Sequence, residues 1–262
     1  MALREEDPAH GAAIAAAGAL GAQGEAHVWW WRPPENTDPA DLPLLDTEEF
    51  RRALSLPAER DAAAFVRSRA AARRALGELF RLEPRDVALG RDACPGCGDG
   101  SHGPPRLVVP PVPLALSTSR TNGCGVFALG AGPAIGIDAE ALRPVRRSAT
   151  TDPDLTPAER AHLAALPQGP ERDAAFHRIW TRKEAVVKAT GLGLSGVELG
   201  LLETHPARTG PVRVTHTHRG RTTAWTVEDL RVFDDVAVAL ARPAGPAAHG
   251  PVHHHVDRPT AA

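Results

Sequence analysis

The spacing of hydrophobic residues along the chain changes from strand-like to helical and back, and it does so twice. An aromatic, β-prone run at residues 26–34 comes first. Helical spacing follows over residues 46–82, where Asp46 suits an N-cap and Pro57 separates a short helix from a longer one. The later segments divide into the same two kinds. Strands are expected at 107–119, 123–132, 134–142, 211–218, 222–230 and 235–242, and helices at 155–166 and 171–190.

The order strand, helices, strands therefore occurs once before about residue 131 and once after it. This order predicts two α+β lobes of roughly 100 residues each, residues 27–131 and residues 132–243. The Ala/Gly-rich start of the chain, residues 1–26, is expected to be a flexible extension. The Pro/Gly/Ala-rich end, residues 244–262, is expected to be a disordered tail.

Composition and charge narrow the choice of partners. The 262 residues carry a formal net charge of −2 with both signs interspersed, so no global field favours nucleic acid or an anionic membrane as a partner. No run reaches the ~18 consecutive apolar residues that a membrane span needs. We expect a cytoplasmic protein whose three cysteines are reduced.

The segment "AIGIDAE", residues 134–140, alternates cleanly between two faces. Ile135 and Ile137 point to one side of the predicted strand, whereas Gly136, Asp138 and Glu140 point to the other. Two carboxylates so placed repel each other unless a positive charge lies between them, and Mg²⁺ accepts such a pair together with phosphate oxygens. The alternative is the solvated outer face of an antiparallel strand.

The lysines of the chain occur only in the helical segment 171–190. Of the 30 basic residues, Lys183 and Lys188 are lysine and the other 28 are arginine. Glu184 and Lys188 share one helical stripe with Trp180. This stripe is either a surface ion pair worth ~0.3–0.5 kcal/mol or a site where a compact ammonium meets phosphate. The arginine bias of the chain favours the second interpretation.

Two motifs together resemble a known family. G-I-D-A-E at 136–140 is followed about forty residues later by W-x-x-K-E-A-x-x-K at 180–188, and this pair resembles the signature of the Sfp-type 4′-phosphopantetheinyl transferases. "HGPPRL" and "LALSTSR" lie where that family has its G-[KR]-P and S-H-S elements. "LTPAER" resembles the segment with a further acidic residue, here Glu159. The resemblance extends over residues 27–242.

The resemblance implies a reaction and a fold. Members of the family transfer the phosphopantetheine arm of coenzyme A to a serine of an acyl or peptidyl carrier protein and release 3′,5′-ADP. They fold as two pseudo-symmetric lobes with coenzyme A in the cleft between them, which suggests a monomer here. No motif distinguishes polyketide, nonribosomal peptide, siderophore and fatty-acid synthase carriers.

The resemblance also assigns roles to residues. Asp138, Glu140 and Glu184 would bind Mg²⁺, and Lys188 and Lys183 would neutralise phosphate charge. Glu184 or a metal-bound water would take the serine proton. These roles agree with the needs of phosphoryl transfer, in which positioning and charge stabilisation supply most of the catalysis.

The coenzyme side of the motif departs from the family. Thr118, between Ser117 and Ser119, stands where the family has the histidine that contacts the 3′-phosphate, and Pro104 stands where it has a basic residue. The candidates for coenzyme binding on this side are Ser117, Thr118, Arg69 and Arg106.

Two other functions remain as hypotheses. One is a coenzyme A or nucleotide-binding protein without transfer activity, which the changes at Thr118 and Pro104 favour. The other is a zinc-binding adaptor built on Cys94, Cys97 and His102, which lacks a clear fourth ligand. The histidine run at 253–255 is assigned no role.

Overall fold

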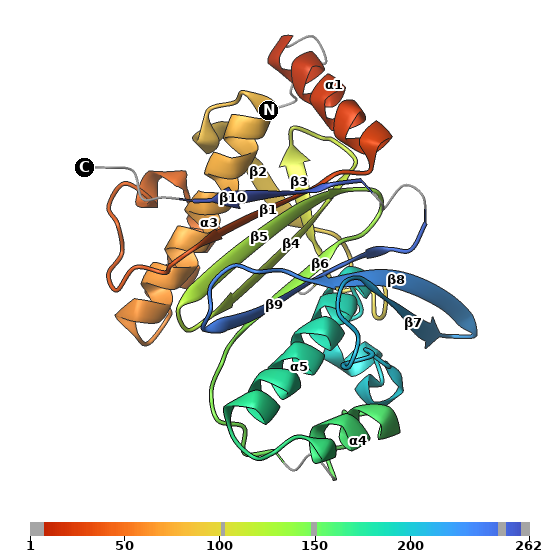
Figure 1. The fold of residues 1–262 in the computed structure, drawn as a ribbon. Coiled ribbons are helices and arrows are strands. Elements are labelled where there is room, and N and C mark those ends of the chain that lie inside the picture. The colour runs from red at the N-terminus through yellow and green to blue at the C-terminus, as the bar shows by residue number, and fades with distance from the viewer. Residues whose placement is uncertain (1–7, 101–102, 148–150, 246–249, 258–262) are drawn as a thin grey trace.

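The computed structural model describes residues 8–100, 103–147, 151–245 and 250–257, and it contains two β-sheets packed beside each other (Figure 1). The six-stranded sheet has the strand order β10-β1-β5-β4-β3-β2. Its strands are β1 (Ala26–Trp31), β2 (Ala88–Arg91), β3 (Pro105–Val109), β4 (Leu114–Thr121), β5 (Cys124–Ala131) and β10 (Val252–Val256). The four-stranded sheet has the order β6-β9-β8-β7. Its strands are β6 (Gly136–Ala141), β7 (Val212–His218), β8 (Arg221–Asp229) and β9 (Val236–Pro243).

The two halves of the chain follow the same path. From β1 and from β6 onward, each half runs from a strand through helices to antiparallel strands, so that the order β1-β5-β4-β3 in one sheet matches β6-β9-β8-β7 in the other. The helices are α1 (Pro8–Gln23), α2 (Thr47–Leu54), α3 (Glu59–Phe80), α4 (Pro157–Ala165) and α5 (Pro170–Thr190). The predicted class, two lobes of sheet and helices, is confirmed.

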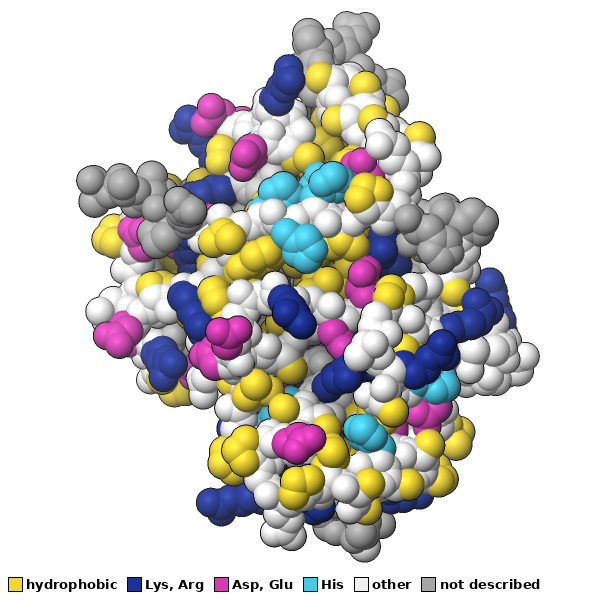
Figure 2. All heavy atoms as spheres, viewed as in Figure 1, with side chains coloured by type: hydrophobic (Ala, Val, Ile, Leu, Met, Phe, Trp, Pro, Cys, Tyr) yellow, Lys and Arg dark blue, Asp and Glu magenta, His cyan; other side chains and the backbone are white. Residues whose placement is uncertain are grey.

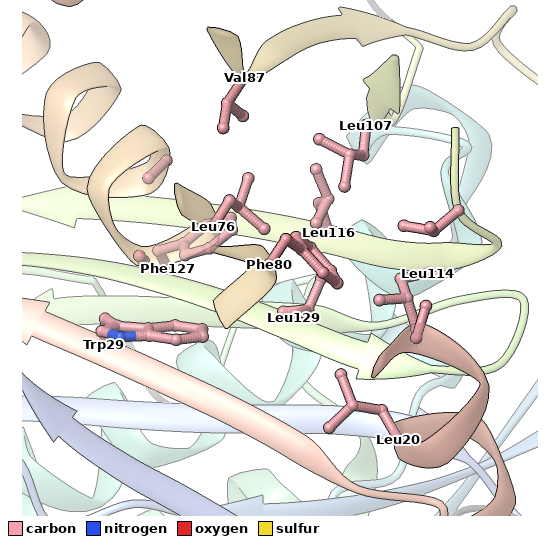
Figure 3. Close-up of a cluster of buried hydrophobic side chains, with 14 of the residues drawn as sticks. Leu20, Trp29, Leu76, Phe80, Val87, Leu107, Leu114, Leu116, Phe127 and Leu129 are labelled. Carbon is pink, nitrogen blue, oxygen red and sulfur yellow. The ribbon is translucent and has the colours of Figure 1, made fainter. Parts of the chain in front are cut away.

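Three apolar clusters hold these layers together. Leu76 and Phe80 of α3 point toward Leu116, Phe127 and Leu129 of the six-stranded sheet (Figure 3). The face of α5 with Val186 and Val187 packs on the four-stranded sheet in the same way. A third cluster joins the two sheets. It includes Val28, Val126, Ile137, Val238 and Leu240.

Local sequence signals fix several helix ends. Asp46 accepts a hydrogen bond from the backbone N–H of Glu49, whose side chain accepts from Asp46 N–H in return, so the predicted N-cap is confirmed. Helix α5 ends at Gly191, whose φ of 72° lies in the left-handed region that glycine adopts without strain.

Both expected terminal segments differ from the prediction. Residues 8–23 form α1, and its Ala13, Ala17 and Leu20 are buried in the core beside α3. Alanine has the highest helix propensity, and small side chains on one face let a helix pack closely against the core. The Ala-rich composition that predicted a flexible extension is therefore also compatible with a docked helix. Residues 252–256 form β10, which pairs in parallel with β1 and satisfies that strand's outer edge. The remainder of both predicted segments, residues 1–7, 246–249 and 258–262, lies outside the described residues.

The strand-like run 107–119, which its prolines at 110, 111 and 113 are expected to break, forms two strands, β3 and β4. Among the described residues, no helix combines the length and apolar character that crossing a bilayer requires.

Candidate active site

Strand β4 of the six-stranded sheet faces β6, the edge strand of the four-stranded sheet. Alternate hydroxyl side chains of β4 point at β6 and accept hydrogen bonds from its backbone. Ser117 Oγ accepts from Ile137 N–H at 3.0 Å, and Thr121 Oγ1 accepts from Ala141 N–H at 3.1 Å. These bonds satisfy amides of an edge strand that has no neighbour on that side. They also fix the position of β6, and of its carboxylates, relative to β4.

Asp138 lies at the centre of this contact between the sheets. Its side chain is 6 % exposed. Its Oδ1 accepts hydrogen bonds from Ser119 Oγ at 2.8 Å and from Lys188 Nζ at 2.7 Å. Its Oδ2 is buried and has no hydrogen-bond partner within the described part of the chain. One oxygen of this carboxylate is therefore held in place while the other is left for a ligand.

Gly136 lets β6 approach α5 closely enough to form this arrangement. A Cβ at position 136 would lie 1.9 Å from the carbonyl oxygen of Ala185 and 2.6 Å from the backbone nitrogen of Ala189. The backbone of the strand thus packs directly on the backbone of the helix. This approach brings Asp138 within reach of Lys188 on α5.

Glu184 and Glu140 bring further negative charge to the same place. Burial raises the pKa of Glu184 to about 7, with the charges of Asp138 and Glu140 adding to the rise and Lys188 opposing it. Burial, and then the charge of Asp138, also raises the pKa of Glu140. The ionised forms of Glu184 and Glu140 are therefore destabilised, and the nearby Lys188 ammonium offsets only part of that cost.

This arrangement fits a hard divalent cation. The carboxylates of Asp138, Glu140 and Glu184 lie near enough to interact, and Asp138 Oδ2 is buried with no hydrogen-bond partner among the described residues, so oxygen ligands for Mg²⁺ are present. The three carboxylates form an open set, because their ligand oxygens do not all lie within 4.8 Å of one another. Among the described residues, the possible ligand atoms of a different group, Glu25, His27 and His253, do lie within 4.8 Å of one another.

A cavity of about 830 Å³ opens beside the carboxylates, between the helices of the first half and α5. Arg52, Arg69 and Arg91 line one wall, and Glu184 and Lys188 line the other. Asp138 and Glu140 lie outside the lining of the cavity, and Asp138 reaches it through Lys188. The space is large enough for a nucleotide-sized ligand, and its mixed charges suit a phosphate-bearing one.

Comparison with known proteins agrees with this geometry. Residues 134–241 match the family model of the 4′-phosphopantetheinyl transferase superfamily. The chain is also 29% identical over 238 residues to 4′-phosphopantetheinyl transferase HetI of Nostoc sp. (strain PCC 7120 / SAG 25.82 / UTEX 2576), an alignment that spans 84% of this chain and 88% of that protein.

The candidate coenzyme-binding residues do not all reach one cavity. Arg69 and Thr118 line the cavity that contains Glu184. Ser117 also borders it, but its side chain is buried and its oxygen accepts from Ile137 N–H. Arg106 lines a second cavity of about 1130 Å³, where its Nε lies 3.3 Å from Asp92 Oδ1. The two cavities share Pro104, Pro105, Lys188 and Gly191 on their walls.

The placement of Lys183 requires a correction. Its side chain is fully buried away from the carboxylate cluster, with Nζ 2.8 Å from Glu159 Oε2. The ammonium also donates to the carbonyl oxygens of Leu199 at 2.6 Å and Leu202 at 2.5 Å. Position 183 is rotated by about 100° from Glu184 around the helix. Lys183 therefore cannot contact phosphate in the cavity, and it ties α5 to α4 and the 199–202 segment.

Sequence reasoning missed Arg52 and Arg91. Arg91 Nη1 donates to the carbonyl oxygen of Gly103 at 2.9 Å, next to Pro104 on the cavity wall. In a chain with 28 arginines, neither residue carries a signal that separates it from the others. Ser119 was included in the motif without a role, and its hydrogen bond to Asp138 could be found only from the contact between the sheets.

The cysteine motif lies near the same region. Cys94 is buried and its thiol donates to the carbonyl oxygen of Gly191 at 3.9 Å, while Cys97 is exposed. His102 lies outside the described residues. No zinc-ligand set that includes Cys94 or Cys97 is found within the described ranges.

Proposed function

We propose that this protein transfers the 4′-phosphopantetheine arm of coenzyme A to a serine hydroxyl of an acyl or peptidyl carrier protein, in a reaction that requires Mg²⁺. One observation carries the proposal above the others. Asp138, Glu140 and Glu184 lie near one another and near Lys188, beside a cavity whose lining holds three arginines together with acidic residues of α2. A pure binding protein has no need of that acidic cluster.

The residues divide the chemistry among them. The serine oxygen forms a bond to the phosphorus that carries the pantetheine, the bond from that phosphorus to the bridging oxygen breaks, and 3′,5′-ADP leaves. Glu184, or a water held by the Mg²⁺, would accept the serine proton. Lys188 offsets negative charge on the leaving group. Mg²⁺, when bound by Asp138, Glu140 and Glu184, would neutralise pyrophosphate oxygens.

Arginines supply the positive charge that the changes at Thr118 and Pro104 remove. Arg69 and Arg91 line the same cavity, and the hydrogen bond of Arg91 to Gly103 places it beside Pro104. Burial lowers the pKa of Arg69, and the charges of Arg91, Arg73 and Arg120 lower it further, while Glu49 opposes them. Crowded cations of this kind gain stability from a bound phosphate. We assign this wall to the 3′-phosphate of coenzyme A.

We also propose a role for each half of the chain. Residues 27–131 would form the lobe that binds the coenzyme's nucleotide, and residues 132–243 would form the lobe that supplies the acidic cluster. The protein would act as a cytoplasmic monomer on carrier domains, with neither nucleic acid nor membrane as a partner.

A panel of apo-carrier proteins tests this function. Purified protein, coenzyme A and Mg²⁺ are incubated with each carrier, and 3′,5′-ADP is measured by chromatography. We expect 3′,5′-ADP only when a carrier and Mg²⁺ are both present. The changes at Thr118 and Pro104 favour a second candidate, a coenzyme A-binding protein without transfer activity. Calorimetric binding of coenzyme A with no product from any carrier would support that candidate.

A further inference from the structure

A second group of ionisable side chains lies far from the cavity, where β10 pairs with β1. Figure 2 shows histidines gathered on the face over these two strands. In the parallel register, His27 is opposite His253 and Trp29 is opposite His255. The His27 ring stacks on the His253 ring with centroids 4.7 Å apart and on the His255 ring at 5.2 Å. Glu25 precedes β1 on the same side of the sheet and faces two of these rings.

The possible ligand atoms of this group lie close to one another. Glu25 Oε2 lies 3.6 Å from His27 Nε2, and Glu25 Oε1 lies 3.5 Å from His253 Nε2. The ligand atoms of all three residues fall within 4.8 Å of one another. A tetrahedral zinc site with bonds of about 2.0–2.1 Å has edges of about 3.4 Å between ligand atoms. The separations of Glu25 from His27 and from His253, 3.6 Å and 3.5 Å, are close to that edge length.

The buried ring of His27 has one nitrogen without a hydrogen bond. His27 is 9 % exposed, and its Nε2, like that of His253, has no hydrogen-bond partner among the described residues. Its other nitrogen, Nδ1, lies 3.0 Å from His255 Nε2. If Nδ1–H donates to His255, the lone pair of His27 Nε2 points toward Glu25. A hydrogen bond to the far nitrogen of a ligating histidine sets the tautomer and the orientation of the ring.

We propose that Glu25, His27 and His253 bind a divalent transition metal of the zinc class, with His255 as the residue that orients His27. Two imidazoles and one carboxylate suit zinc, whereas Mg²⁺ prefers oxygen ligands alone. Three protein ligands leave a fourth position for water. The site is therefore distinct in chemistry and in place from the acidic cluster of the cavity.

Such a metal would hold the C-terminal strand on β1. The strand is short, and its other attachments are few. Asp257 N–H donates to the carbonyl oxygen of Trp30, and the Asp257 carboxylate pairs with Arg67 of α3 at 2.6 Å. Without β10 the backbone of β1 would expose an unpaired edge. A metal bound by His27 and His253 would join residues 226 positions apart in the sequence. Because such a metal binds only the folded state, it would add to the stability of the fold.

Zn²⁺ titration of the untagged, chelator-treated full chain tests the proposal. Calorimetry is expected to give one site per chain, and thermal melting is expected to shift upward when Zn²⁺ is added. Glu25→Gln, His27→Gln and His253→Gln are each expected to abolish that site, and His255→Ala to weaken it about 10–100-fold. His254→Gln is the matched control and should bind as the wild type does, because His254 lies on the opposite face, against the edge of Trp30.

Two results would overturn the proposal. The first is an absence of stoichiometric binding at micromolar Zn²⁺. The second is unchanged affinity in Glu25→Gln, which would mean that the histidine run at 253–255 chelates metal by itself. Glu25→Gln is nearly isosteric, so it remains informative if His27→Gln does not fold. The visible absorption of bound Co²⁺ gives an independent readout of the tetrahedral ligand set in the same variants.

Discussion

Lys188 Nζ lies 2.7 Å from Asp138 Oδ1 and 3.4 Å from the carbonyl oxygen of Thr118, so one ammonium joins α5, β6 and β4. The same contact holds one oxygen of Asp138 and leaves the other, Oδ2, without a hydrogen-bond partner among the described residues. The acidic cluster is thus built where the two sheets meet. Its position depends on elements from both halves of the chain.

Asp138→Asn is expected to reduce the transfer rate by at least about 100-fold, in the range found when one group that stabilises transition-state charge is removed. Asparagine keeps the size of the side chain and can still accept from Ser119, so the melting temperature should change by only a few degrees. Steady-state kinetics and a thermal melt on one preparation check both parts. Turnover close to that of the wild type would show that the cluster lies in the wrong place.

Substitution of Lys183 is expected to lower mainly stability, whereas substitution of Lys188 is expected to lower mainly activity. Lys183→Met leaves the Glu159 carboxylate buried without its cation and should lower the free energy of unfolding by about 3–5 kcal/mol. Lys188→Met is the matched control on the same helix. It should abolish transfer while lowering stability far less, because Lys188 is 28 % exposed and Asp138 keeps its hydrogen bond from Ser119. Urea unfolding and kinetics on the pair measure this contrast, and equal losses of stability would contradict it.

The raised pKa of Glu184 predicts a pH dependence of stability in the metal-free protein. The folded state holds this proton up to about pH 7, whereas an unfolded carboxyl releases it near its ordinary value of 4.5. The favourable contribution is therefore complete below about pH 4.5 and is lost as the pH rises through 7. Glu184→Gln removes this dependence. Relative to the wild type, it should gain on the order of 1–2 kcal/mol between pH 5 and pH 8.

Urea unfolding in the presence of a chelator at these two pH values gives the comparison for Glu184. The same slope with pH in both proteins would mean that Glu184 is not desolvated beside Asp138 and Glu140. Repeating the series with Mg²⁺ should reduce the difference between the proteins, because a cation stabilises the ionised carboxylates.

Arg91→Ala tests the wall assigned to the 3′-phosphate. A charge-assisted hydrogen bond worth about 1.5–3 kcal/mol corresponds to roughly a 10–100-fold rise in KM for coenzyme A. The KM for 3′-dephospho-coenzyme A should hardly change, since that analogue lacks the phosphate. Arg85→Ala, on an exposed arginine outside the cavity, serves as the control. A preference for coenzyme A that survives Arg91→Ala would move the 3′-phosphate elsewhere.

Local patterns predicted the acidic strand correctly because its information is local. The alternation of Ile137 and Ala139 with Asp138 and Glu140 is repeated in the structure, where the apolar pair is buried in the core. The same pattern contained Gly136. A glycine is needed there because a Cβ would collide with the backbone of α5, and this contact could not be predicted from the strand alone.

The features that could not be predicted depend on contacts between residues that are distant in sequence. Helical spacing puts Lys188 on the stripe of Glu184 and Lys183 beside it, but the ion pair that buries Lys183 could not be predicted because Glu159 lies on another helix. Arg91 gains its place through a carbonyl twelve residues away. Strand β10 pairs with a strand more than 220 positions earlier, a contact that no local periodicity encodes.

Phosphopantetheinyl transfer is tested by the intact mass of a purified apo-carrier protein after incubation with this protein, coenzyme A and Mg²⁺. We predict a gain equal to one phosphopantetheine group, which disappears when the acceptor serine of the carrier is replaced by alanine or when Asp138→Asn replaces the wild type. A folded, coenzyme A-binding preparation that leaves the mass of every carrier in a broad panel unchanged would contradict it.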